Sequence, residues 1–161
     1  MRQYVEPSRQ LIAGVRTKAL KVIADERGRL MEILRADDEL FRKFGQAYVT
    51  VAYPGVVKAW HYHKTQVDHF CCVSGMAKVV LCDDREGSKT RGLVNEFFIG
   101  EHHQMLIEIP ALVFHGIMCI SEREAIVLNL PTEPYDHAHP DEFRVAAHDE
   151  RIPYDWSRKD G

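Results

Sequence analysis

The chain has 161 residues, of which 45% are hydrophobic and 28% are charged, so it matches one domain of ordinary size and excludes wholesale disorder. Lys and Arg number 21 against 24 Asp and Glu, and a net charge of −3 disfavours a general nucleic-acid-binding polycation. No stretch approaches the roughly 20 apolar residues that span a bilayer, and the polar N-terminus predicts no signal peptide. We expect one cytoplasmic domain over residues 1–161, with neither nucleic acid nor membrane as a partner.

Short apolar runs separated by turn residues predict strands along most of the chain. The expected strands cover residues 11–15, 19–23, 30–33, 47–53, 56–61, 68–73, 77–81, 94–98, 105–109, 116–120 and 125–130. One short helix is expected over residues 39–44, with Asp37 or Asp38 as its N-cap and Gly45 at its end. This pattern predicts an all-β sandwich or barrel such as a jelly roll. The tail, residues 131–161, is expected to be ordered by packing over the barrel.

Four polar residues have a spacing that suggests one shared site. His61 and His63 lie two apart on a predicted strand, so their side chains leave the same face. Asp68 opens the next strand, and His115 begins a later one. We expect the four to converge in the mouth of the barrel, where imidazoles and a carboxylate suit Fe, Mn, Ni, Cu or Zn. The other histidines, His69 among them, are expected at the surface.

Two motifs in this region resemble those of the cupin superfamily. The matching residues are Gly55, His61, His63, Asp68 and Gly75 in the first motif, and Pro110 and His115 in the second. Asp68 stands where cupins carry Glu, and Leu112 replaces a Gly. The resemblance implies a cupin-type jelly-roll barrel. It also supports one alternative function, a metal-dependent oxygenase or isomerase that holds a transition-metal ion through His61, His63, Asp68 and His115.

A narrower resemblance covers most of the chain. Segments 25–32, 44–46, 55–62, 84–92, 109–110 with 114–116, and 156–160 are similar, in their shared order, to the dTDP-4-dehydrorhamnose 3,5-epimerase family of nucleotide-sugar epimerases. The resemblance implies an enzyme of carbohydrate biosynthesis that acts on a nucleotide-linked 4-keto-6-deoxy sugar without a cofactor. It also implies a homodimer, often with strand exchange between the subunits.

Roles for individual residues follow from the same resemblance. His61 matches the family's catalytic base, and Asp160 matches the aspartate that pairs with that base. A ketone at C4 acidifies the neighbouring C–H, whose proton the base removes. The residues expected to contact the nucleotide or sugar are Arg27, Glu32, Gln46, Lys58, His115 and Asn129.

Three positions depart from the family pattern. Asp68 replaces the lysine that helps hold the enolate, and Asn129 replaces the tyrosine that donates a proton from the opposite face. His63 stands where the family usually has another residue. These changes favour epimerisation at one carbon, a keto-isomerisation or a metal-assisted variant over epimerisation at two carbons. They also keep open a second alternative, a cupin that binds a sugar nucleotide without catalysis.

Overall fold

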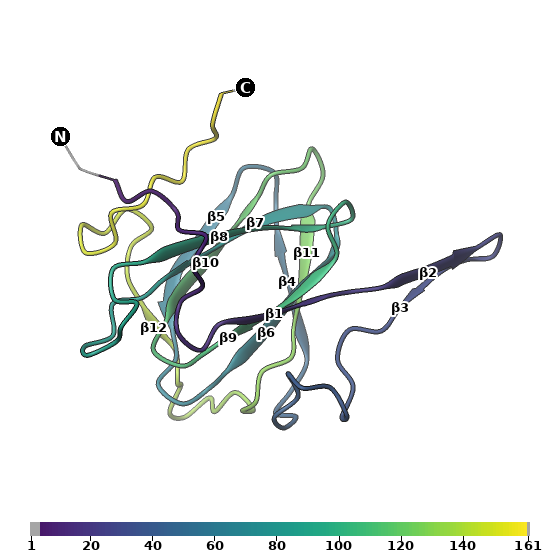
Figure 1. Cartoon of the computed structure of the whole chain (residues 1–161), viewed down its shortest axis with the longest axis horizontal. Coiled ribbons are helices and arrows are strands. Elements are labelled where there is room, and N and C mark those ends of the chain that lie inside the picture. The colour runs from purple at the N-terminus through teal and green to yellow at the C-terminus, as the bar shows by residue number, and fades with distance from the viewer. Residues whose placement is uncertain (1–3, 161) are drawn as a thin grey trace.

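Two antiparallel five-stranded sheets face each other in the computed structural model, which describes residues 4–160 (Figure 1). The first sheet contains, in spatial order, β1 (Arg16–Ala19), β9 (Met105–Ile109), β6 (Asp68–Ser74), β11 (Ala125–Asn129) and β4 (Tyr48–Ala52). The second contains β12 (Phe143–Arg144), β5 (Val57–Tyr62), β10 (Phe114–Cys119), β7 (Met76–Cys82) and β8 (Val94–Gly100). β2 (Val22–Asp25) and β3 (Gly28–Met31) form a hairpin that extends away from both sheets. The predicted all-β jelly-roll class is confirmed.

The main core lies between the two sheets because alternate residues of each strand point inward. Phe70 and Cys72 come from β6, Val79 and Leu81 from β7, and Ile117 from β10, and each is at most 3% exposed. Burying side chains of this kind stabilises the fold by about 1.5–3 kcal/mol each. The inward pattern of β6 includes Asp68, so a carboxylate enters the interior at the end of an otherwise apolar row.

The C-terminal tail covers the outer face of the second sheet, as predicted. Ile152, Tyr154 and Trp156 are buried there with Trp60 of β5, and the ring centroids of Trp60 and Trp156 lie 5.0 Å apart. The indole nitrogen of Trp60 also donates a hydrogen bond to the backbone oxygen of Ala147. The tail thereby fixes Trp60 on the outer face of β5.

The predicted short helix is wrong, and residues 4–160 contain no helix at all. Residues 36–40 form turns, because the Asp38 carboxylate accepts a hydrogen bond from the backbone nitrogen of Arg35 and pairs with Lys18 instead of capping a helix. Leu40 is 7% exposed and packs against the outer face of β6 and β9. Six residues form too few helical hydrogen bonds to offset the cost of nucleation. The described chain accordingly has no helical membrane span.

The expected strand over residues 11–15 is also absent, and regular pairing begins at Arg16. Ile12 and Val15 are still buried. The backbone nitrogens of Ile12 and Ala13 donate instead to the side chains of Asn95 and Thr90, which takes the place of a sheet ladder. At the other end of the chain, β12 has only two residues, too few for an apolar pattern to mark it.

An irregular register between β5 and β10 brings two histidines together. His115 pairs with His61, and Ile117 pairs with Lys58, so two residues of β5 face Gly116 alone. A Cβ at Gly116 would lie 2.4 Å from the Cβ of Ala59, so only glycine allows the two backbones to approach this closely. The close approach sets His61 directly beside His115.

Candidate active site

A cavity of about 780 Å³ opens between the two sheets, a size that suits a bound small molecule. Its walls come from β4, β5 and the segment 133–144. The residues expected at the site that line it are Gln46, Lys58, His61 and His63. The cavity therefore collects residues from both sheets and from the loop that follows β11.

His61 is a partly buried imidazole on the wall of this cavity. Its ring centroid lies 4.1 Å from that of His115, its cross-strand neighbour. Burial and the neighbouring imidazole of His115 hold the pKa of His61 well below its usual value, although the Asp68 carboxylate acts in the opposite direction. His61 is therefore neutral at physiological pH and can accept a proton.

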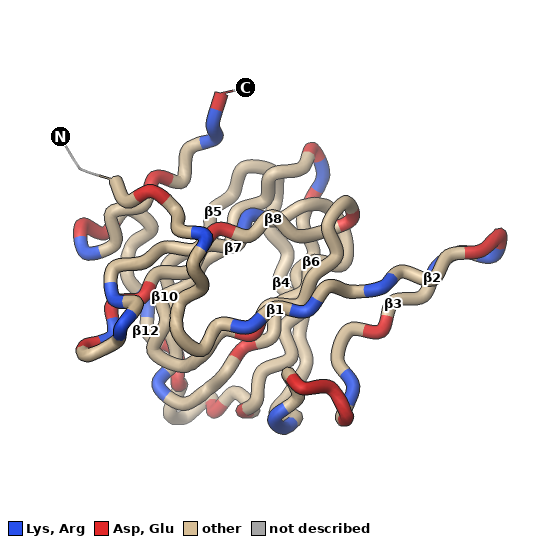
Figure 2. Tube along the Cα trace, in the orientation of Figure 1, with Lys and Arg blue, Asp and Glu red and all other residues tan. Residues whose placement is uncertain are grey.

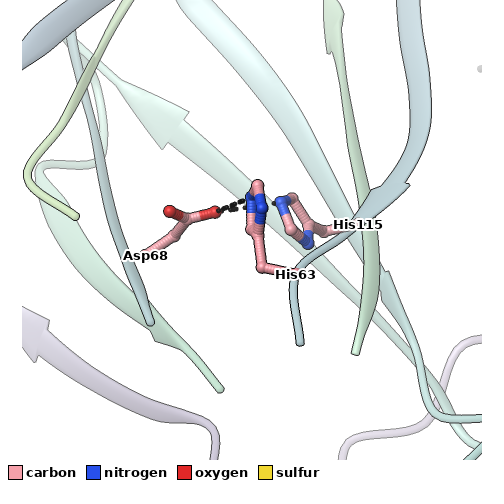
Figure 3. A group of neighbouring side chains, drawn as sticks. All are labelled: His63, Asp68 and His115. Atoms are coloured by element: carbon pink, nitrogen blue, oxygen red, sulfur yellow. Dashed lines mark ion pairs between the residues drawn. The ribbon is translucent and has the colours of Figure 1, made fainter. Parts of the chain in front are cut away.

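Asp68 lies behind the cavity between two histidines. Its side chain is 1% exposed, and its Oδ2 atom is 3.1 Å from the Nε2 atom of His63 and 3.1 Å from the Nε2 atom of His115 (Figure 3). The amide nitrogens of Gln66 and Asn129 donate to Oδ1 over 2.7 and 2.9 Å. A buried carboxylate that has lost its water thus gains polar partners on both oxygens.

Backbone carbonyls fix the orientation of both histidine rings. Nδ1 of His63 donates to the backbone oxygen of Asp141, and Nδ1 of His115 donates to that of Val113 over 3.0 Å. Each Nε2 atom is thereby left facing Asp68 (Figure 3). Burial opposes charge on both partners, but the histidines hold the pKa of Asp68 well below its usual range. Asp68 in turn raises the pKa of His63.

Asn129 and Tyr48 extend this network toward the cavity. The two residues are directly opposite each other in the pairing of β11 with β4. The Asn129 amide nitrogen, which donates to Asp68, also lies 2.9 Å from the Tyr48 hydroxyl oxygen. Burial and the Asp68 charge raise the pKa of Tyr48 to about 12, so its phenol stays protonated at neutral pH. Sequence reasoning missed Tyr48, because only the strand pairing brings it next to position 129.

The three atoms around Asp68 could also hold a metal ion. One ligand atom each from His63, Asp68 and His115 lies within 4.8 Å of the others. Despite their 3.1 Å separation, Asp68 Oδ2 and His115 Nε2 form no well-oriented hydrogen bond with any described residue. Histidines whose Nδ1 atoms are fixed by carbonyls are typical metal ligands. His61, the fourth residue of the expected metal set, is outside this group.

Two cationic side chains lie on the cavity wall. Lys58 projects from β5 and donates from its Nζ atom to the Thr50 hydroxyl over 3.0 Å. Arg144 of β12 is paired with His61 in the register of β12 with β5, and its guanidinium contacts Glu142. Arg144 was not expected from the sequence, because β12 itself was not predicted. Both cations are placed to attract an anionic ligand.

Three expected site residues lie away from both the cavity and the group around Asp68 in their own chain. Arg27 is at the tip of the β2–β3 hairpin, where its 85% exposed side chain pairs with Asp25. Glu32 follows β3 and pairs with Arg35. Asp160 is exposed, in a C-terminal segment that extends away from the sheets (Figure 1).

Comparison with known proteins places this geometry among sugar epimerases. Residues 23–143 match the family described as the polysaccharide biosynthesis C-terminal domain. The chain is 45% identical over 146 residues to a probable low-salt glycan biosynthesis epimerase, Agl13, of Haloferax volcanii, with 89% of each chain covered. It is 40% identical over 147 residues to the spore coat polysaccharide biosynthesis protein SpsL of Bacillus subtilis, covering 91% of this chain and 97% of that protein.

A solved structure of a related protein has a similar fold. The crystal structure of a dTDP sugar isomerase from Desulfovibrio desulfuricans G20 superimposes with a TM-score of 0.87 at 29% identity. The match covers 92% of this chain and 94% of that one. The two facing sheets therefore belong to a fold that the two proteins share.

The pKa values of His61 and His63 should be shifted in opposite directions. We expect the His61 ring to stay neutral as the pH falls through 6.5, because burial disfavours its charged form, and His63 to remain protonated above pH 6.5 because Asp68 stabilises its charge. Ring ¹⁵N chemical shifts followed by NMR over a pH series report both. Protonation of His61 at or above pH 6.5 would contradict the assignment of a neutral base.

Proposed function

This chain belongs to the polysaccharide biosynthesis C-terminal domain family and is a dTDP-4-dehydrorhamnose 3,5-epimerase-like protein, and from that membership we propose that it epimerises or isomerises a nucleotide-linked 4-keto-6-deoxy sugar. The observation that carries the proposal is the position of His61, whose imidazole lies on the wall of a cavity large enough for a sugar; burial and the neighbouring His115 also hold its pKa below the usual value. A neutral imidazole in that position suits the removal of a proton from carbon.

In this proposal the ketone of the sugar supplies the acidity. Removing a proton from the carbon beside the C4 ketone leaves the electron pair of the C–H bond in an enolate, whose oxygen carries the negative charge. His61 takes that proton and becomes an imidazolium. Asp68 is not an unopposed anion near the enolate, because it is paired with His63, whose pKa it raises. The neighbouring imidazolium of His61 then stabilises the enolate.

The nucleotide diphosphate would occupy the polar side of the cavity. Lys58 offers a point charge to a phosphate, in contrast to the bidentate contact that an arginine gives. Arg144, beside His61 on the adjacent strand, supplies a second cation and a planar guanidinium. Gln46 accepts a hydrogen bond from the backbone nitrogen of Tyr135 and keeps its amide nitrogen for the ligand.

Replacing the base should abolish proton exchange. We expect wild-type protein, incubated with dTDP-4-keto-6-deoxyglucose in deuterated water, to incorporate deuterium at C3 or C5. The H61Q variant should exchange at least about 100-fold more slowly than wild type, because no other group accepts the proton. NMR and mass spectrometry measure the exchange, and H102Q, which changes an exposed histidine, is the control. Exchange by H61Q at the wild-type rate would contradict the role of His61. If the wild-type protein binds the sugar nucleotide but catalyses no exchange, the result would favour a non-catalytic cupin.

We propose that the chain works as a homodimer. The β2–β3 hairpin exposes Val22, Ile23 and Leu30, which are 39%, 54% and 58% exposed, and a lone hairpin with such a surface is only marginally stable. Acidic and basic residues lie together at its tip (Figure 2). Packing of this hairpin on a second copy would cover its apolar residues. In that arrangement Arg27 and Glu32 would reach the cavity of the partner subunit.

Subunit mixing tests this dimer. Homodimers of R27A and of H61A should each be inactive, the first through loss of a substrate contact and the second through loss of the base. Co-expressed mixed dimers should regain activity, because one of their sites combines a native His61 with a native Arg27 of the partner subunit. Activity is measured on dimers purified through two different tags. No recovery, or a monomer in sedimentation, would contradict the arrangement.

The group around Asp68 supports a second candidate, a metal-dependent cupin enzyme. His63, Asp68 and His115 would hold the ion, since two imidazole nitrogens and a carboxylate fit a divalent transition metal and the contact of Asp68 Oδ2 with His115 Nε2 is not a well-oriented hydrogen bond. A bound ion would act there as a Lewis acid toward the substrate oxygen. We favour the metal-free enzyme, because the carboxylate already has two histidine partners at 3.1 Å.

Elemental analysis separates these two candidates. We expect untagged protein to contain far less than one transition-metal ion per chain, and EDTA to leave deuterium exchange unchanged, because the base is an imidazole. Mass spectrometry of the digested protein measures the metal. Near-stoichiometric metal that disappears in H63A, but not in the exposed-site control H102A, would favour the metal-dependent enzyme instead.

A further inference from the structure

Inversion at a carbon needs two proton carriers on opposite faces of the sugar. His61 removes a proton from one face, and a second group has to deliver a proton to the other face. The family places a tyrosine for this purpose at the position of Asn129, and an amide does not act as an acid near neutral pH. The proposed reaction therefore lacks its proton donor at the expected position.

A phenol lies directly beside that position. We propose that Tyr48, the cross-strand neighbour of Asn129, is the proton donor of this enzyme. Its hydroxyl oxygen is 2.9 Å from the Asn129 amide nitrogen, and its side chain lines the same cavity as His61. This inference deepens the proposed function and rests on it.

The two sheets place Tyr48 and His61 on opposite sides of the cavity. Tyr48 begins β4 in the first sheet, whereas His61 lies on β5 in the second sheet, and these sheets face each other (Figure 1). A sugar bound between the sheets would present one face to the imidazole and the other face to the phenol. This is the arrangement that inversion requires, and it does not depend on the residue at position 129.

Hydrogen bonding leaves the phenol hydrogen available. The Asn129 amide nitrogen donates to the Tyr48 oxygen, so the phenol accepts this bond and its own hydrogen is not consumed by it. Among residues 4–160, this is the one hydrogen bond that the Tyr48 hydroxyl makes. Burial and Asp68 raise the pKa of Tyr48 to about 12, which keeps the proton in place until an enolate carbon, a much stronger base, withdraws it.

Other titratable groups at the cavity suit the role less well. His63 has both ring nitrogens engaged, one with the Asp141 backbone and one with Asp68. The Asp141 carboxylate has a pKa of about 2, because four hydrogen bonds from residues 64–66 outweigh the effect of burial, so it carries no proton to give. Tyr135 is a second phenol, but it belongs to the segment after β11 and packs against His137.

The proton balance of the step is complete. The C–H electron pair passes to the enolate and the proton to His61; the enolate carbon then takes the phenol proton on its other face. Tyr48 is left as a phenolate, held by the Asn129 amide, and His61 as an imidazolium. His61 then releases its proton to water and Tyr48 takes a proton from water, which restores the starting state.

The test separates exchange from inversion in deuterated water. We expect Y48F to invert the sugar at least about 100-fold more slowly than wild type. It should still exchange the proton that His61 removes, because a deuteron returns from His61 to the same face with retention of configuration. Y53F, which changes an exposed tyrosine just after β4, should behave as wild type. NMR of the product distinguishes deuterium incorporation with retention from inversion.

Several outcomes would overturn the assignment. Inversion by Y48F at the wild-type rate, or its loss in Y135F but not in Y48F, would exclude Tyr48 as the donor. Loss of both exchange and inversion in a folded Y48F that still binds the sugar nucleotide would also exclude it. If Y48F does not fold, the double variant Y48N/N129Y, which exchanges the two residues, is compared with the single variant Y48N. Inversion that is recovered in the double variant supports a proton donor at the paired positions 48 and 129. No recovery contradicts it. Absence of exchange by the wild-type protein would contradict the proposed function itself, and this outcome is distinct from those that exclude only Tyr48.

Discussion

The buried carboxylate of Asp68 is the feature on which the rest of the site depends. It lies 1% exposed at the end of an apolar row on β6, where an isolated charge would be costly. His63 and His115 approach one oxygen, and Gln66 and Asn129 donate to the other. Because His115 and Asn129 come from β10 and β11, whereas His63 and Gln66 come from the segment just before Asp68, satisfying this one charge fixes three parts of the chain relative to one another.

The proposed chemistry follows from the register of two strand pairs. The pairing of β5 with β10 sets His61 beside His115, and the pairing of β4 with β11 sets Tyr48 beside Asn129. The first pair lies in one sheet and contributes an imidazole that burial keeps neutral. The second pair lies in the facing sheet and contributes a phenol whose pKa of about 12 keeps it protonated at neutral pH. A fold made of two facing sheets can thereby act on both faces of a flat enolate.

Local sequence patterns predicted most of the strands, although residues 11–15 form none and the expected strand over 19–23 spans the break between β1 and β2. They predicted the contacts between distant strands poorly. His61 and His63 were assigned to one face because strand periodicity needs only neighbouring residues. His69 was expected at the surface, yet it is fully buried, because the opposite face of β6 is covered by the segment around Leu40, which it contacts through a 3.0 Å hydrogen bond. Tyr48 could be recognised only from its pairing with Asn129, a relation between residues far apart in the sequence. The family role of Asp160 stays a prediction, since that exposed residue belongs to a C-terminal segment that extends away from the sheets.

A crystal structure with an unreactive dTDP-sugar analogue bound tests the central claim most directly. The account predicts that C3 or C5 of the sugar lies between the two sheets, with a ring nitrogen of His61 facing one side of that carbon and the Tyr48 hydroxyl facing the other. A sugar bound outside this cavity, or one whose reacting carbons face away from His61, would contradict it.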